Sequence, residues 1–268
     1  MTVAILTDFG ASDNYNGVME AVIKKFNRHV DITYISPNAK NFNVIAGSYL
    51  LYTSYRYFRK NTIFLTVIDP GVGTSRKAII IRTNNYHFVG PDNGVLYPAS
   101  IEDGIISAVE ISNRKIYLAK EISNTFHGRD IFSITAALIS LKVPLDTFGN
   151  QLKKEQIQKL DLGSYRNNEK ICTKVLYVDH FGNVSLGIKN VKVKQGQMAE
   201  IETGGKRFVV LTAKTFQDSE KDLLLYRNGY GFLELGLNKA DASVVLNVKE
   251  GDEICVEQSI LEDFSPFI

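Results

Sequence analysis

The chain has 268 residues, of which 44% are hydrophobic and 22% are charged, and its formal net charge is +2. These values are typical of a globular protein with a sizeable core, in one large domain or two smaller ones. Lysine and arginine are scattered, which argues against a nucleic-acid-binding surface. No apolar run has the length of a membrane span, and the N-terminal segment reads as a strand rather than a signal peptide. We therefore expect a cytoplasmic protein with no membrane attachment.

The first half of the chain alternates strand and helix patterns. In chain order we expect a strand at 3–6, an amphipathic helix at 16–27, a strand at 32–35, a long helix at 43–58, strands at 63–68 and 77–83, a hairpin turn at 84–85, a strand near 105–109 and a helix from about 129 to 141. This alternation predicts an α/β domain over residues 1–163. Its sheet should be mostly parallel with helices on both faces, a Rossmann-like arrangement.

The second half of the chain changes character. From residue 171 onward short alternating strands dominate, and glycine-containing turns separate them. The pattern predicts a smaller all-β domain over residues 164–268, a small barrel or a sandwich. The polar stretch 151–170 is the best candidate for the connector.

Two cysteines, Cys172 and Cys255, lie inside apolar strand-like runs. Two such residues cannot make a disulfide scaffold, and their spacing does not suit a zinc site. We therefore expect two buried free thiols and no metal centre.

The loop at 69–76 carries a carboxylate, Asp69, and a guanidinium, Arg76, on either side of a Pro-Gly turn. It lies between two strands, and open α/β folds bind small molecules where strands end in loops. Its glycines allow a ligand to approach the backbone closely. Taken alone, however, Asp-Pro-Gly is an ordinary turn. The loop fits neither the dinucleotide fingerprint nor a P-loop.

A second candidate cluster closes the first strand. Asp8 ends that strand and Asp13 follows shortly after. A carboxylate at this position can accept hydrogen bonds from both hydroxyls of a ribose. The alternative is a turn or a cap for the helix that follows.

A third cluster, at residues 124–130, precedes the helix that ends near residue 141. The N–H groups at a helix start favour negative charge. His127 is the one histidine of four beside a glycine at such a position. A structural histidine is the usual alternative, but His127 is the histidine that we expect to act.

A fourth cluster opens the β domain. Asp179 offers a carboxylate for an ammonium group, Phe181 a ring for packing, and Asn183 an amide for the edge of a base. The same residues also make a good β-turn. Together the clusters suggest a nucleoside with a charged amino-acid tail.

Five motifs, in order, resemble those of the S-adenosyl-L-methionine (SAM) hydroxide adenosyltransferase family, which is related to fluorinating and chlorinating enzymes. They lie at residues 7–10, 69–76, 90–96, 125–130 and 179–183, and the similarity runs to about residue 240. The resemblance implies cleavage of SAM to adenosine and L-methionine, by hydroxide attack on the ribose 5′ carbon and without a cofactor. It also implies a homotrimer, with each site shared between the N-terminal domain of one subunit and the β domain of its neighbour.

The resemblance also implies roles for individual residues. The catalytic residues would be Asp69, Arg76 and His127. The substrate-binding residues would be Asp8, Asp13, Phe126, Gly128, Asp179, Phe181, Asn183, Phe216 and Tyr230. Among these, Asp8 would hold the ribose, Asp179 the methionine ammonium and Asn183 the adenine. The chain departs from the family at Gly229, where relatives commonly have a serine that reaches the methionine carboxylate. The backbone or Tyr230 would replace that contact, and Phe216 would stack on the adenine.

The chemistry of the reaction assigns a role to each catalytic residue. Making free hydroxide at neutral pH costs about 12 kcal/mol, because the pKa of water is about 15.7. Arg76 stays protonated and would stabilise negative charge on the attacking oxygen. His127 would hold the water or accept its proton, and Asp69 would orient one or both of the others.

Two other functions remain open. A protein that only binds SAM or adenosine would use the same nucleoside contacts without the catalytic trio. A halide-using adenosyltransferase is the other alternative, but the resemblance gives those relatives a tyrosine in place of His127. SAM methyl transfer is disfavoured, since no glycine-rich loop follows the first strand.

Overall fold

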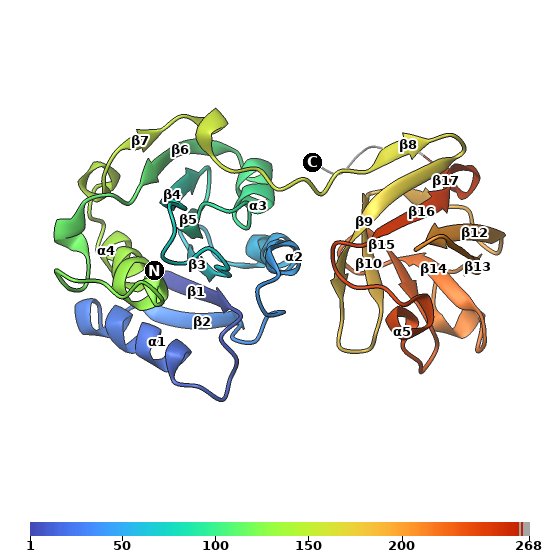
Figure 1. Cartoon of the computed structure of the whole chain (residues 1–268), viewed down its shortest axis with the longest axis horizontal. Coiled ribbons are helices and arrows are strands. Elements are labelled where there is room, and N and C mark those ends of the chain that lie inside the picture. The colour runs from blue at the N-terminus through green and yellow to red at the C-terminus, as the bar shows by residue number, and fades with distance from the viewer. Residues whose placement is uncertain (263, 265–268) are drawn as a thin grey trace. The chain divides into compact units, whose positions relative to one another are not determined.

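The computed structural model describes residues 1–262 and 264. The chain forms two compact units, Met1–Leu160 and Asp161–Ile268, and each is described by itself (Figure 1). In the described part of the chain, no helix has the length and hydrophobicity needed to cross a membrane.

The first unit is built on a seven-stranded sheet with the order β2-β1-β3-β5-β4-β6-β7. Its strands are β1 (Thr2–Thr7), β2 (Asp31–Ser36), β3 (Ile63–Val67), β4 (Ala78–Thr83), β5 (His87–Pro91), β6 (Ile105–Glu110) and β7 (Gln151–Leu152). Strands β2, β1, β3 and β5 pair in parallel, whereas β4, β6 and β7 add antiparallel pairs. The α/β class is confirmed, but the sheet is mixed rather than mostly parallel. The physical reason is the tight turn at Asn84-Asn85, since so short a link can join only antiparallel strands.

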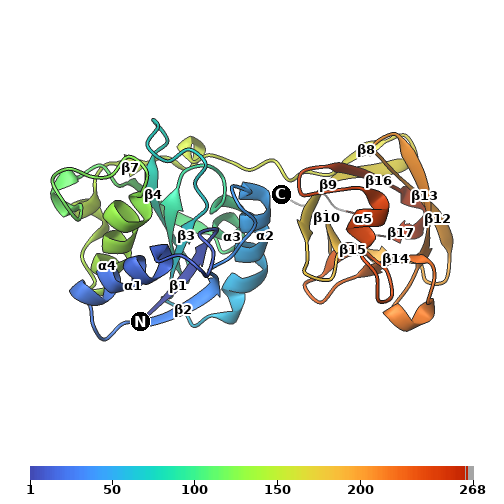
Figure 2. The same ribbon diagram turned by 60° about the horizontal axis from the view of Figure 1, so that its bottom comes forward.

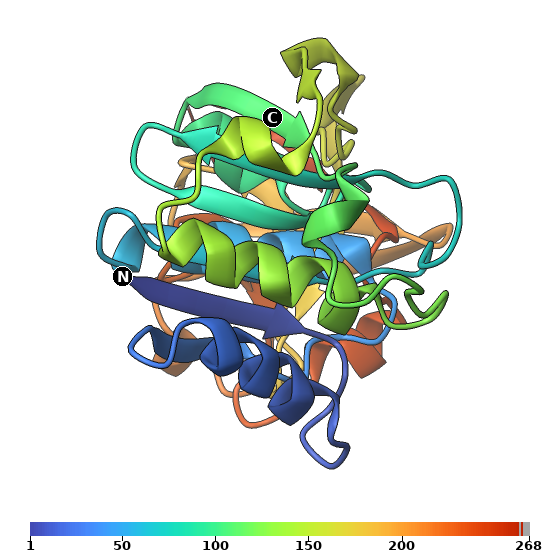
Figure 3. The same cartoon turned by 90° about the vertical axis from the view of Figure 1, so that its left-hand side faces the viewer.

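Helices cover both faces of this sheet, as predicted. They are α1 (Tyr15–Phe26), α2 (Val44–Ser54), α3 (Tyr97–Glu102) and α4 (Ile134–Ser140), with short helical turns η1 (Tyr55–Tyr57), η2 (Arg114–Ile116), η3 (Gly128–Ser133), η4 (Leu145–Phe148) and η5 (Lys154–Gln156). Helices α1 and α4 pack against each other on one face, and α2 and α3 on the other (Figures 1 and 3).

The sequence explains why these elements form. Strand β1 is buried over five consecutive residues because helices cover both of its faces. Helix α1 buries Met19, Val22 and Ile23 on one face and ends with two lysines that suit its negative end. The side chain of Asn43 caps α2 by accepting the N–H of Ala46 at 3.0 Å.

The second unit is a β-barrel, which confirms the predicted class. Its strands are β8 (Tyr165–Asn167), β9 (Lys170–Val178), β10 (Val184–Lys189), β12 (Met198–Thr203), β13 (Lys206–Thr212), β14 (Leu223–Arg227), β15 (Phe232–Gly236) and β16 (Glu253–Glu257), with a separate pair, β11 (Lys192–Val193) and β17 (Leu261–Glu262). Strand β10 pairs with both β15 and β9, so seven strands close into a ring, and β8 extends the sheet beyond β9.

A short helix, α5 (Ala242–Leu246), packs on the barrel core through Ala242 and Leu246 (Figure 2). The remaining helical turns of this unit are η6 (Phe216–Asp218) and η7 (Gln258–Ile260). Apolar side chains that alternate along the strands fill the barrel interior, as in other small barrels.

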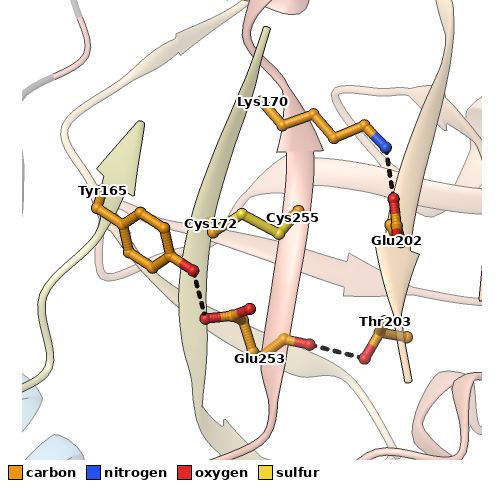
Figure 4. Close-up of a disulfide and its surroundings, with 7 residues drawn as sticks. All are labelled: Tyr165, Lys170, Cys172, Glu202, Thr203, Glu253 and Cys255. Atoms are coloured by element: carbon orange, nitrogen blue, oxygen red, sulfur yellow. Dashed lines mark hydrogen bonds and ion pairs between the residues drawn. A yellow bond between two sulfur atoms is a disulfide. The ribbon is translucent and has the colours of Figure 1, made fainter. Parts of the chain in front are cut away.

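The two cysteines are not free thiols, so this prediction was wrong. Cys172 on β9 and Cys255 on β16 form a disulfide (Figure 4). The two strands pair antiparallel with these residues directly opposite each other, and their Cα atoms lie 3.9 Å apart. The residues are 83 positions apart in sequence, so the pairing depends on strand register, which composition does not reveal.

Candidate active site

Asp69, Arg76 and His127 meet at one point of the first unit, although the histidine comes from a distant segment. The Arg76 guanidinium donates from Nε to Asp69 Oδ1 at 3.1 Å and from Nη2 to Oδ2. The same Nη2 lies 3.1 Å from His127 Nδ1, and Nη1 donates to the Lys77 carbonyl at 3.1 Å. The guanidinium carbon lies 5.4 Å from the centre of the Phe132 ring. Contacts in several directions therefore fix the orientation of Arg76.

Burial makes this cluster electrostatically strong. The side chains of Arg76 and Asp69 are only 8% and 5% exposed. Burial raises the pKa of Asp69 above its ordinary value, although Arg76 opposes the shift. Burial, together with the charge of Arg76, lowers the pKa of His127. His127 is therefore neutral at neutral pH.

The protonated nitrogen of His127 follows from its contact with Arg76. A guanidinium can only donate hydrogen bonds, so His127 Nδ1 must be the acceptor. The neutral ring then carries its proton on Nε2. His127 can thus offer one N–H donor to a ligand while Arg76 holds the other side of the ring.

A cavity of about 310 Å³ lies beside the cluster. It is lined by Asp8, Phe9, Tyr15, Asn41, Phe42, Val67, Asp69, Val72, Thr125, Phe126, His127 and Gly128. Two of the predicted catalytic side chains thus face this space, whereas Arg76 lies behind them. The wall is aromatic on one part and carries two carboxylates and an imidazole on another, a combination that suits a polar small molecule.

Asp8 lies on the cavity wall, as its predicted role requires. Its Oδ2 accepts the N–H of Phe42 at 2.7 Å, which leaves further acceptor positions on the carboxylate. Burial raises the pKa of Asp8, while the N–H of Phe42 acts in the opposite direction. The alternative role of Asp8 as the cap of α1 does not apply, because the cap residue of that helix is Asn14.

Gly73 explains how the loop at 69–76 reaches the segment that carries His127. Its φ is +77°, and a Cβ built there would lie 2.3 Å from the carbonyl oxygen of Asn124. Only glycine allows two backbones to approach this closely with that conformation. The close approach brings the two segments together at the cluster of Asp69, Arg76 and His127.

Of the other predicted substrate-binding residues in this unit, Phe126 and Gly128 line the cavity and Asp13 does not. Phe126 packs edge-on against Tyr15 at 5.1 Å and against Phe9 at 5.9 Å. Asp13 is exposed. Its role in binding stays a prediction.

The barrel unit carries a second cavity, of about 610 Å³. It is lined by His180, Phe181, Asn183, Phe216, Leu237, Asn238, Lys239, Ala240 and Asp241. Three predicted binding residues are thus gathered around one space. Gly236 makes room for this arrangement, because a Cβ there would lie 2.7 Å from Asn183 Oδ1 and 2.9 Å from the Phe216 ring.

Asp179 does not line this cavity, but it orients two residues that do, Phe181 and Asn183. Its Oδ1 accepts the N–H groups of Phe181 and Asn183, both at 2.9 Å, and its Oδ2 accepts from Asn183 Nδ2 at 2.8 Å. The turn chemistry noted as the alternative for this motif is therefore present. An amide has two N–H groups and one acceptor oxygen, so Asn183 can still bind the edge of a base.

Tyr230 is 51% exposed and lies outside the lining of both cavities. Its backbone N–H donates to Asn228 Oδ1 at 2.9 Å, within a turn that also contains Gly229. Asn228 is in turn bound to Glu234 Oε2 at 2.7 Å, so the turn is anchored to the barrel. Whether Tyr230 replaces the family serine stays a prediction.

Several cavity-lining residues were not predicted from the sequence. They are Phe9, Tyr15, Asn41, Phe42, Val67, Val72 and Thr125 in the first cavity, and His180, Leu237, Asn238, Lys239, Ala240 and Asp241 in the second. Phe9, Val72 and Thr125 lie inside the motifs at 7–10, 69–76 and 125–130, although no binding role was assigned to them. Phe42 could not be found from these motifs, since it arrives on the loop that follows β2.

Among the described residues, one group has metal-ligand spacing, namely Cys172, Glu253 and Cys255. Its two sulfur atoms are bonded to each other, so neither is available as a thiolate ligand. The group belongs to the disulfide and not to either cavity.

Known proteins are similar to this chain in sequence and in fold. Models of the SAM hydroxide adenosyltransferase N-terminal and C-terminal domains match residues 3–149 and 173–255. A protein of Methanocaldococcus jannaschii named (R)-S-adenosyl-L-methionine hydrolase is 31% identical over 94% of this chain and 94% of its own. A fluorinase of an Actinoplanes species is 23% identical over 96% and 97% of the two chains. The crystal structure of an uncharacterized conserved protein from Thermotoga maritima has a TM-score of 0.85 and 40% identity, covering 95% and 99% of the two chains.

Proposed function

Because the chain belongs to the SAM hydroxide adenosyltransferase family, we propose that it hydrolyses (R)-S-adenosyl-L-methionine to adenosine and L-methionine. The observation that carries this proposal is the contact of one buried arginine, Arg76, with both Asp69 and His127 at a cavity wall. A protein that only binds its ligand has no need to bury such a cluster of charged groups, since burying charge is costly. Perturbed ionisable groups that gather at a cavity are typical of catalytic sites.

The proposed reaction is an in-line displacement. The oxygen of water forms a bond to the ribose 5′ carbon, the bond from that carbon to sulfur breaks, and one proton is released. Methionine leaves as a neutral thioether, so the leaving group needs no acid. The main barrier is the nucleophile, because free hydroxide at neutral pH costs about 12 kcal/mol.

In the proposed reaction, His127, Asp69 and Arg76 each have a different role toward the attacking water. Neutral His127 offers its Nε2–H to the attacking oxygen and holds it in place. Asp69 is the acceptor for the proton of the water, since burial raises its pKa above that of an ordinary carboxylate. Arg76 lies behind both groups and keeps them oriented, and its charge stabilises the negative oxygen. Of the two roles expected for His127, this arrangement favours holding the water over accepting its proton.

The remaining predicted residues divide into two half-sites. In the first unit, Asp8 would bind the ribose hydroxyls while Phe126 and Gly128 shape the cavity wall. In the barrel, Asn183 would bind the adenine edge between Phe181 and Phe216. Asp179 would attract the methionine ammonium with the lone pairs that its turn leaves available. No cofactor takes part in this proposal.

We further propose a cytoplasmic homotrimer in which each site is shared between neighbouring subunits, as the family resemblance implies. This proposal is supported by the distribution of six predicted binding residues: Asp8, Phe126 and Gly128 line a cavity of the first unit, and Phe181, Asn183 and Phe216 line a cavity of the barrel.

The decisive experiment incubates purified protein with (R)-S-adenosyl-L-methionine in water enriched in oxygen-18 and separates the products by chromatography coupled to mass spectrometry. We expect adenosine labelled at its 5′ oxygen, together with methionine. Parallel reactions with fluoride and chloride test the halide-using alternative, which would yield 5′-halogenated adenosine. If SAM remained unchanged in every reaction, the proposal would be contradicted, and the alternative of a protein that only binds SAM would be favoured. Arg76→Ala should reduce turnover at least about 100-fold, whereas Arg82→Ala, an exposed arginine of β4, is the matched control.

A further inference from the structure

Asp130 is a buried carboxylate close to the candidate site that the proposed reaction does not use. It is only 1% exposed. Its Oδ2 accepts the N–H of Ser123 at 2.7 Å, and Arg129 donates to both carboxylate oxygens, from Nε at 2.6 Å and from Nη2 at 2.9 Å. A buried ion of this kind is costly unless its acceptors are satisfied, and here three donors satisfy them.

The backbone of Asp130 holds the same region. Its carbonyl accepts the N–H of Leu118 at 3.0 Å, and its own N–H donates to the Phe126 carbonyl at 3.2 Å. Together with the contact to Ser123, residue 130 is therefore tied to three points of the segment that leads into His127. That segment has little regular secondary structure of its own, so these bonds fix its course.

Arg129 extends this anchoring to the cavity wall. Its guanidinium carbon lies 5.2 Å from the centre of the Phe126 ring, and Phe126 lines the cavity. The charge of Asp130 holds the guanidinium in this position. The segment η3, which precedes α4, is a π-helix. Within it, the Ser133 hydroxyl donates to the Gly128 carbonyl at 2.8 Å. Such π-helical turns are frequent at functional sites.

We propose that Asp130 is the positioning residue for His127: its carboxylate, bound to Ser123 and Arg129, acts with its backbone contacts to clamp the segment at 118–126 onto the start of η3, so that Phe126 and His127 face the cavity. This inference rests on the proposed function for its catalytic meaning. The clamp itself rests on the hydrogen bonds above and does not depend on which reaction the site performs.

The charge of Asp130 adds an electrostatic effect to the clamp. The charged groups that act on His127 are Arg76 and Asp69 from the loop at 69–76 and Asp130 from its own helix. Burial and Arg76 lower the pKa of His127, and the two carboxylates oppose that shift. Removing the charge of Asp130 should therefore lower the pKa of His127 further. A carboxylate with a purely structural role far from the ring would leave that pKa unchanged.

Two variants separate the clamp from the charge. Asp130→Asn keeps an acceptor for the Ser123 N–H but removes the charge, whereas Asp130→Ala removes both. We expect Asp130→Ala to reduce kcat for SAM about 100-fold, since a small displacement of a reacting group can have that effect. Asp130→Asn should reduce kcat less, about 10-fold. In both variants KM should change less than kcat, because Asp8 and the barrel residues that would hold the nucleoside have no contact with Asp130.

The second readout does not depend on turnover. The pKa of His127 is measured by NMR titration of its ring nitrogens in the wild type and in Asp130→Asn. We expect a lower pKa in the variant, with protonation moved to more acidic pH. The control is Asp103→Asn, which changes another carboxylate that accepts a backbone N–H, from Asn85 at 2.9 Å, away from the cavity. The control should leave both kcat and the pKa of His127 unchanged.

The two readouts also distinguish the possible failures. If the wild type does not cleave SAM while the pKa of His127 falls in Asp130→Asn, the proposed function fails and the coupling of Asp130 to His127 stands. If the folded variants keep wild-type kcat and an unchanged pKa of His127, the positioning role of Asp130 is refuted. Should Asp130→Ala fail to fold, Asp130→Asn alone decides both points.

Discussion

At the scale of single residues, the proton on His127 determines what this side chain can do. Arg76 donates to Nδ1, so the neutral ring presents an N–H donor at Nε2. The amide of glutamine can imitate that donor, whereas it cannot accept a proton as a base does. We therefore expect His127→Gln to keep at least about 10 times more activity than His127→Ala, as turnover of SAM measured by adenosine release.

Equal activities of the two variants would contradict the donor role. If both were inactive while each still bound adenosine, His127 would be the base, and Asp69 would have only an orienting role. Adenosine affinity measured for each variant by calorimetry is the control, since a collapsed cavity would weaken binding as well as catalysis.

Asp8 should affect binding rather than the chemical step. Its carboxylate lines the cavity and accepts one backbone N–H, from Phe42, which fixes its orientation. Losing a charged acceptor for two hydroxyls should weaken adenosine binding by about 2 kcal/mol, roughly 30-fold. Calorimetry of Asp8→Ala with adenosine measures this effect directly. Asp31→Ala, an exposed carboxylate at the start of β2, should bind adenosine as the wild type does.

At the scale of elements, the close approach of two backbones at Gly73 brings together the segments that carry Asp69, Arg76 and His127. Gly73→Ala would force its Cβ onto the Asn124 carbonyl and leave a side chain at positive φ. We expect a loss of about 1–3 kcal/mol in the free energy of unfolding and a marked fall in turnover, as the loop and the segment carrying His127 separate. Chemical denaturation and the SAM assay measure the two effects.

Gly17 provides the matched control. It lies inside α1, and a Cβ built there meets no atom within 4 Å. Gly17→Ala should therefore stabilise the protein by about 0.5–1 kcal/mol and leave turnover unchanged. If Gly73→Ala behaved in the same way, the contact between the two segments would have no role in the site.

Most elements of the first unit could be predicted from the sequence because local patterns encode them. The spacing of apolar residues in α1 and the turn at Asn84-Asn85 are examples, and both agree with the structure. The expected helix at 43–58 ends earlier as α-helix, at Ser54, and continues as a 3₁₀ turn. The helix expected from about residue 129 begins as a π-helix, which hydrophobic spacing does not distinguish from an α-helix.

The sequence predicted three residues that the structure brings together, but it did not predict their contacts. The motifs gave Asp69, Arg76 and His127, yet Arg76 and His127 are 51 positions apart and meet only through tertiary packing. For the same reason, the sequence did not indicate that Arg76 lies behind the other two residues. The orientation of a side chain within a cluster depends on partners such as Phe132, which no local pattern identifies.

At the scale of the whole molecule, the disulfide should stabilise the barrel. Cys172 and Cys255 close a loop with a sequence separation of 83, and a loop of that length corresponds to about 4.5 kcal/mol in the chain-entropy model. We expect the Cys172→Ser/Cys255→Ser variant to lose about 2–4 kcal/mol. Thermal unfolding of the whole chain measures the loss, and hydrogen exchange should localise it to β9 and β16 rather than to the first unit.

Whether the disulfide is present in the purified protein also bears on the proposed cytoplasmic location. A persistent disulfide is uncommon in a reducing cytoplasm, with thermophiles as an exception. Thiol labelling of the denatured, unreduced protein should find no free cysteine. A reductant should lower the melting temperature of the wild type and leave that of the serine variant unchanged. Labelling of both cysteines would restore the original expectation of free thiols.

If each site is shared between neighbouring chains of a homotrimer, two inactive variants should restore activity when they are mixed, whereas a site within one chain would not allow this. His127 belongs to the first unit and Asn183 to the barrel, so His127→Ala and Asn183→Ala disable different half-sites. Mixed trimers of the two variants, formed by co-expression, would pair an intact first unit of one chain with an intact barrel of its neighbour. In a closed ring with random mixing, about a quarter of the sites should be fully wild type. We therefore expect turnover to recover to about a quarter of the wild-type value, although each variant alone is nearly inactive. If the mixture stays inactive while native mass spectrometry of differently tagged chains shows mixed trimers, the site is not shared between neighbouring chains in the proposed way.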